Sequence, residues 1–347
     1  MNTKEVRAVL CAAVSLCGLA ILDRSLVAQE NEREDQHKPC HGMSWSAPVN
    51  MGEPINSPDN DSHSWITKNG LSLYITTTRF SHSVRDEDIA VSQRRSLHDP
   101  WSEPVRLGPN VNTIGYNDSV PSISEDGLDL YFHSPRPGGC GAADIYVSHR
   151  IDPTDDFGWQ PAVNLGCVVN SPGPDNGPDF FRAEGTDYLY YLQTKPPGGI
   201  GTLPNIVVST RPTGTGDFDW GSPVPVNALN SEYVQGRMSI RRTDGLEILF
   251  TSTRPGLIGD TTSDIWVSTR ESLWSPWSPP ANLGPPISIP GYDDGSPHLD
   301  FDGTTLYFFS TRPGGFGGRD LYTSTRCFCD DPDNSRSEDG NHSCKEN

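Results

Sequence analysis

Four acidic or amide side chains stand at a similar distance before tight-turn pairs, and they are the residues best placed to bind a ligand. They are Asp61, Asp118, Asn176 and Asp294; Gly236 holds the fifth such position. The carboxylates of Asp61, Asp118 and Asp294 are hard oxygen ligands of the kind that calcium prefers, and they also suit a polyhydroxylated or basic ligand. Asp and Asn equally often cap their own turn, so the sequence leaves both roles open.

Two further charged residues break the pattern near these positions. Asp179, with Asp61 and Asp118, is a candidate carboxylate for glycoside hydrolysis, which needs acids from separate parts of the chain. Arg237 follows Gly236 and either binds an anionic group or neutralises the acids. We assign no catalytic residue, because no carboxylate stands out from the repeat and no Ser-His-Asp pattern accompanies His133 or His298.

A repeat of roughly 60 residues must position these side chains. Each copy has a Trp-Pro segment, then a turn pair such as Asp126-Gly127 before an alternating apolar run, then a short strand such as 144–147 opened by an acid or amide. Four short antiparallel strands at this spacing are typical of a propeller blade. The sequence therefore predicts an all-β fold, a single five-bladed β-propeller of four-stranded blades.

The propeller is predicted to span residues 45–326 and to close on itself. The chain starts a repeat with a Trp segment and ends the fifth repeat after its third strand, so residues 45–50 should complete the last blade. Residues 29–44 are expected to be a linker and residues 327–347 an acidic tail that contains cysteines.

Two other residue types recur with the blades. We expect basic residues after each second strand to pair across a hairpin with the acid that opens the third strand; these are Arg79, Arg136, Lys195, Arg254 and Arg312. We expect the repeated Trp residues to anchor blade packing at the rim; these are Trp45, Trp101, Trp159, Trp220 and Trp277. Trp65 and Trp274 lie outside the repeat and are candidate platforms for a sugar ring.

The N-terminus and the cysteines indicate export. Lys4 and Arg7 precede an apolar run too short for a comfortable membrane span, so residues 1–28 read as a signal peptide, with an uncleaved anchor as the alternative. The even number of cysteines after it favours disulfides over zinc. Cys140 and Cys167 are expected to pair, and Cys40 to lie near Cys327 and Cys329, with Cys344 fixing the tail. We expect a monomeric protein that is periplasmic or secreted.

The repeat units resemble the WD-like propeller repeats of the TolB type. The residues that carry the resemblance are Ser122–Phe132 and Phe301–Gly315, and it spans about residues 45–326. It implies a propeller in an exported protein, but the chain lacks the α/β domain of TolB and has five blades in place of six.

Charge and fold together lead to the functional hypotheses. The net charge of −19 repels nucleic acid and anionic lipid. The first hypothesis is a non-catalytic scaffold that binds a protein, glycan or other envelope component on its axial face, with no cofactor except a possible calcium ion. The alternative is a five-bladed glycoside hydrolase that uses axial carboxylates, and a third hypothesis is a structural domain without a small-molecule site.

Overall fold

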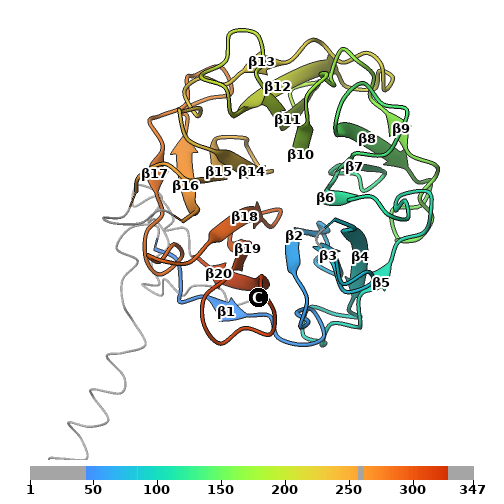
Figure 1. Ribbon diagram of the computed structural model, residues 1–347, viewed down its shortest axis with the longest axis vertical. Coiled ribbons are helices and arrows are strands. Elements are labelled where there is room, and N and C mark those ends of the chain that lie inside the picture. The colour runs from blue at the N-terminus through green and yellow to red at the C-terminus, as the bar shows by residue number, and fades with distance from the viewer. Residues whose placement is uncertain (1–43, 84, 257–261, 327–347) are drawn as a thin grey trace, which may run out of the picture. The chain divides into compact units, whose positions relative to one another are not determined.

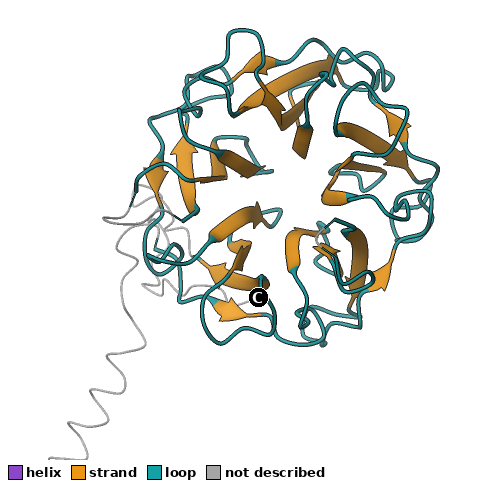
Figure 2. Ribbon diagram, in the orientation of Figure 1, coloured by secondary structure: helices purple, strands orange, loops and turns teal. Residues whose placement is uncertain are grey.

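The computed structural model describes residues 44–83, 85–256 and 262–326, and the compact unit is Trp45–Arg326. Twenty strands form five four-stranded antiparallel sheets arranged in a ring (Figure 1). Within the described residues there is no helix, and every strand belongs to one of the five sheets (Figure 2). The predicted all-β, five-bladed propeller is therefore confirmed.

Each blade runs outward from the axis in chain order. Blade 1 holds β2 (Asp61–Ile66), β3 (Ser72–Thr77), β4 (Asp88–Gln93) and β5 (Val105–Arg106). Blade 2 holds β6 (Ser119–Ile123), β7 (Asp129–Ser134), β8 (Asp144–His149) and β9 (Val163–Asn164). Blade 3 holds β10 (Asp175–Ala183), β11 (Thr186–Thr194), β12 (Pro204–Pro212) and β13 (Val224–Pro225). Blade 4 holds β14 (Gln235–Ile240), β15 (Glu247–Ser252), β16 (Asp264–Thr269) and β17 (Ala281–Asn282).

Blade 5 combines the two ends of the ring, as the sequence predicts. It holds β18 (Asp294–Leu299), β19 (Thr305–Ser310) and β20 (Asp320–Thr325), and β1 (Val49–Asn50) pairs antiparallel with β20. The N-terminal segment thus supplies the rim strand of the last blade. Because the ring closes in this way, no blade is left with an unpaired neighbour.

The core lies between adjacent blades. One cluster joins Trp65 and Tyr74 of blade 1 to Leu130 and Phe132 of blade 2, and four similar clusters fill the remaining interfaces. An arginine stacks on each repeated rim Trp, with its guanidinium carbon 4.3–4.5 Å from the ring centroid. Burial of the apolar face and this cation–π contact explain why a Trp starts every repeat.

Several predicted features lie outside the described residues. These are the signal peptide, nearly all of the linker, Cys40, Cys327, Cys329, Cys344 and the acidic tail. The predicted bridge Cys140–Cys167 is present, with a Cα–Cα distance of 5.4 Å. Over the part of the chain that the structure describes, no helix is long and apolar enough to cross a membrane.

Candidate functional site

The acids that open the inner strands are buried and hydrogen-bonded. Asp118 accepts a hydrogen bond from the backbone N–H of Thr113 on one oxygen and, at 2.6 Å, from Nη2 of Arg136 on the other. Its side chain is fully buried, and burial raises its pKa. The same two contacts hold Asp61 with Ser57 and Arg79, and Asp294 with Ile289 and Arg312. These contacts have the form of a structural cap.

These contacts correct the predicted arginine pairs. We expected the basic residues after each second strand to face the acid of the third strand, but Arg79, Arg136 and Arg312 pair with the acid of the inner strand. Thr77, at the end of the second strand, pairs with both Asp61 and Asp88, so both acids lie beside the turn, and Arg79 forms its ion pair with the inner one, Asp61. The third-strand acid Asp88 pairs instead with Arg106 at 2.7 Å.

Blade 3 shifts the predicted position by one residue. Asp175, and not Asn176, opens β10 and pairs with Gln193, because the turn of this blade is a two-residue hairpin between Ala183 and Thr186. Asp175 accepts hydrogen bonds from Ser171 and from Gln193, and burial raises its pKa to about 6. Asn176 is the following residue and is only partly buried.

The proposed calcium ligands do not converge. Asp61, Asp118 and Asp294 stand in three different blades, each with an arginine partner. Over the described residues, no group of three or more His, Cys, Asp or Glu side chains is arranged to hold a metal ion. The residues present therefore do not fit a calcium site at these acids.

A bulge interrupts the pairing of every inner strand with its neighbour. The register of each inner strand shifts near its start, and the residue at the shift has a positive φ in four blades. In blade 1 this residue is His63, whose Nδ1 lies 2.7 Å from Oγ of Ser296, the matching residue of blade 5. His133 lies close by, with Nε2 3.1 Å from Oγ of Ser119. Burial holds the pKa of His63 well below its usual range and that of His133 at about 4, so both imidazoles are neutral.

Arg237 supplies a buried positive charge to the same region. Its side chain is 3% exposed and its Nη2 donates to the carbonyl oxygen of Pro121 at 2.9 Å. Among the described atoms its Nε and Nη1 have no hydrogen-bond partner. Burial lowers the pKa of the Arg237 guanidinium to about 10, so it is charged at neutral pH. The other predicted axial acid, Asp179, is fully buried and bonded to Arg242 at 2.5 Å and to the N–H of Ile240 at 2.9 Å.

Glu87 is a carboxyl group that the sequence reasoning missed. It precedes β4, its carbonyl accepts the N–H of Asp118, and its side chain interacts with Ser119 and Arg319 on the face where the inner strands begin, here called the start face. Burial raises the pKa of Glu87, while Arg319 and the hydrogen bond from Ser119 oppose that rise. The other blades have Ala143, Pro204, Ser263 and Arg319 at this position, which is the signal that could have identified it.

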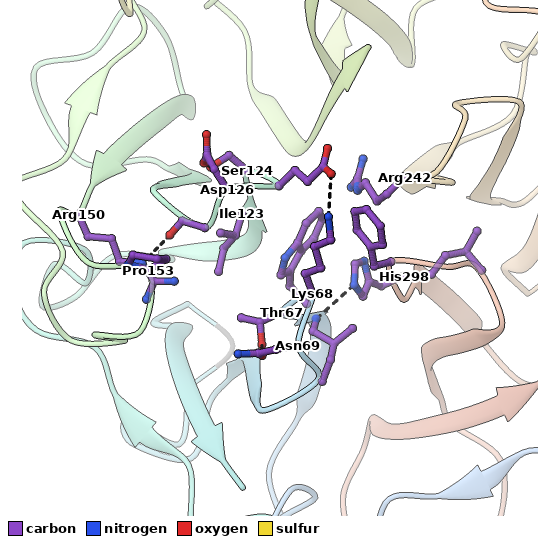
Figure 3. Close-up of a pocket in the computed structure, with 16 residues that line it drawn as sticks. Thr67, Lys68, Asn69, Ile123, Ser124, Asp126, Arg150, Pro153, Arg242 and His298 are labelled. Carbon is purple, nitrogen blue, oxygen red and sulfur yellow. Dashed lines mark hydrogen bonds and ion pairs between the residues drawn. The ribbon is translucent and has the colours of Figure 1, made fainter. Parts of the chain in front are cut away.

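A pocket of about 290 Å³ opens on the opposite face, here called the turn face, where the first and second strands of the blades are joined (Figure 3). Blades 1 and 2 supply most of its wall, including Trp65, Lys68 and Glu125, and Arg242 and His298 come from blades 4 and 5. Trp65 is 5% exposed and packs against both His298 and Arg242, so the predicted sugar platform is instead part of this wall. Trp274, the other candidate platform, is 77% exposed.

Known structures share this five-bladed architecture. No family model and no curated protein sequence matches the chain. A thermostable family-43 glycoside hydrolase matches with 15% identity and a TM-score of 0.53, over 80% of this chain and 93% of that one. An α-L-arabinofuranosidase from Lactobacillus brevis matches with 14% identity and a TM-score of 0.53, over 80% and 93%. An exo-1,5-α-L-arabinanase from a bovine ruminal metagenomic library matches with 13% identity and a TM-score of 0.50, over 79% and 99%.

These neighbours correct two predictions. The resemblance to TolB-type repeats is wrong, because the matching structures are five-bladed glycoside hydrolase propellers; strand and turn patterns common to propellers explain the error. The first functional hypothesis, a non-catalytic scaffold, is contradicted by the same comparison, which favours the hydrolase alternative. At these identities the likeness establishes the fold alone.

Proposed function

We propose that the chain is a glycoside hydrolase whose reaction centre lies on the start face, with Glu87 as the general acid. The observation that carries the proposal is the raised pKa of Glu87 beside the axial side chains. Glycoside hydrolysis needs a carboxyl group that is still protonated at the working pH, and burial is the usual way to obtain one. The fold shared with arabinan-degrading and family-43 hydrolases supports the same class of reaction.

In this proposal the Glu87 proton passes to the glycosidic oxygen as its bond to the anomeric carbon breaks. Water then supplies the hydroxyl group of the released sugar and returns its remaining proton to the Glu87 carboxylate. Arg237 and Arg319 make the region positive, and Arg319 lowers the pKa of Glu87 in opposition to the larger effect of burial. Asp61, Asp118 and Asp179 are not assigned to the reaction, because each already forms an ion pair within the fold.

The test compares two leaving groups. Glu87→Gln should lower the hydrolysis of arabino- and xylo-oligosaccharides by about 10²- to 10⁴-fold, the usual contribution of a general acid. Nitrophenyl glycosides of the same sugars depart without a proton, so their hydrolysis should fall much less. Glu103→Gln, at an exposed rim position, is the matched control. Equal losses on both substrates, or no hydrolysis by the wild-type protein of any glycoside tested, would refute the proposal.

Export to an oxidising compartment is part of the proposal. The bridge between Cys140 and Cys167 supports it, because structural disulfides persist in secreted and periplasmic proteins. Residue-by-residue mapping of the N-terminus of the protein purified from its native host tests whether residues 1–28 are removed.

A further inference from the structure

The pocket on the turn face interrupts a ring of contacts between the inner strands. In four blades one side chain accepts the backbone N–H of the next inner strand; these are Ser122 to Phe180, Asp179 to Ile240, Ser239 to Leu299 and His298 to Ile66. The fifth position is Trp65, whose indole has no acceptor to offer the N–H of Ile123. The pocket opens at this place, between blades 1 and 2.

The buried polar atoms of the pocket that lack partners are all donors. Nε2 of His298 accepts the N–H of Ile66 at 3.2 Å, so in the neutral ring the proton is on Nδ1. That Nδ1, together with Nε and Nη1 of Arg242 and Nη2 of Arg150, has no partner among the described atoms. These residues are 1%, 9% and 4% exposed. Buried donors without acceptors are costly, so a ligand that brings oxygen acceptors would be stabilised here.

The charges around the pocket favour a ligand with one negative charge over a ligand with two. Arg242 is paired with Asp179, and Arg150 with Asp156, so the donors belong to cations that are already neutralised. At the surface, Lys68 and Glu125 form an ion pair at 3.0 Å between the turns of blades 1 and 2 (Figure 3). A monoanion fits this balance better than a dianion does.

The remaining wall is apolar and sets the size of the ligand. Ile66, Ile123, Leu299 and Phe301 line it, and its volume of about 290 Å³ matches one sugar ring. We propose that this pocket binds the carboxylate of a monosaccharide-sized sugar acid, such as a hexuronate. The site is on the opposite face from Glu87, so the inference does not depend on the proposed reaction.

Calorimetry on the full-length protein tests the inference with glucuronate and galacturonate, with glucose as the neutral match and inorganic phosphate as the dianion. At least one hexuronate should bind about tenfold or more tightly than glucose, because the carboxylate supplies charge-assisted acceptors. Binding of phosphate but of neither hexuronate would overturn the assignment of a carboxylate, and equal binding of glucose would overturn the anion site itself.

Two variants locate the binding. Arg242→Gln should weaken the hexuronate about tenfold. Since that change leaves Asp179 without its partner and threatens folding, Glu125→Gln provides a second test. It removes an exposed negative charge at the mouth and should strengthen binding by about threefold, the scale of an exposed ion pair. Glu103→Gln makes the same charge change at the rim and should leave affinity unchanged. Equal behaviour of Glu125→Gln and Glu103→Gln would overturn the location, whereas Glu87→Gln should bind as the wild type does.

Discussion

Replacing Asp118 by Ala should destabilise the propeller without acting on its chemistry. The carboxylate is fully buried and its partner Arg136 has a side chain only 14% exposed, so the change leaves a largely buried guanidinium without its counter-charge. Breaking a buried pair from one side costs about 3–5 kcal/mol. In a unit of roughly 280 residues each kcal/mol lowers the Tm by about 2 °C, so we expect a fall of roughly 6–10 °C.

The protein contains its own milder versions of this change. In blade 3 the acid Asp175 accepts a hydrogen bond from Gln193 and not from an arginine, and blade 4 has Gln235 in place of the acid, with Arg254 still bonded to Leu229. Arg136→Gln and Asp118→Gln each put a neutral amide into the pair, as blades 3 and 4 do, and should each lower the Tm by less than Asp118→Ala does. Scanning calorimetry and an activity assay on the folded fraction provide the measurement. If Asp118→Ala kept its Tm within about 2 °C and lost activity, the carboxylate would act on a ligand and our assignment of a cap would fail.

Two further changes test the stability of the propeller and how that stability depends on pH. Replacing both Cys140 and Cys167 by Ser should cost about 3–4 kcal/mol, because the bridge spans 27 residues and its loss frees that loop in the unfolded chain; urea unfolding with and without reductant measures it. Hydrogen bonds to Asp129 and Asp217 raise the pKa of His149 from 6.5 to about 10. A raised pKa gives stability that is complete below about pH 6.5 and is lost as the pH rises through 10. The Tm difference between wild type and His149→Gln should therefore shrink across that interval, and a difference that grew with pH would contradict the assigned charge of His149.

The ring was predictable because each blade repeats the same local signals. Turn pairs such as Asp126-Gly127 and the rim Trp residues are local signals within one repeat. They predict the strands and turns of a blade without information about the other blades. The closing strand followed from the same argument, since Trp45 begins a repeat whose other strands come at the opposite end of the chain. The number of blades, five and not six, separates this protein from the TolB type. The sequence of the repeat alone did not separate them.

The site was less predictable because it depends on register and on contacts between blades. A turn shortened to Glu184-Gly185 moved the acid of blade 3 from Asn176 to Asp175, and counting along the chain cannot detect that shift. Glu87 lies in a loop, and the two residues that its side chain interacts with, Ser119 and Arg319, belong to two other blades. The pocket lies beside Trp65, where the indole cannot accept the N–H of the next inner strand as the matching side chains of the other four blades do. None of these neighbours is close in sequence.

The pairing of β1 with β20 has a consequence for how the ring assembles. The segment that begins with Trp45 is made before the strands it packs against, and its partners at Leu306, Phe308 and Tyr322 are among the last residues of the ring to be synthesised. During synthesis this apolar segment therefore has no sheet to pack against. The last blade forms only when β1 pairs with β20. A chain stopped before β20 would retain four complete blades but an open circle, with β18 and β19 as an exposed edge able to pair with another copy.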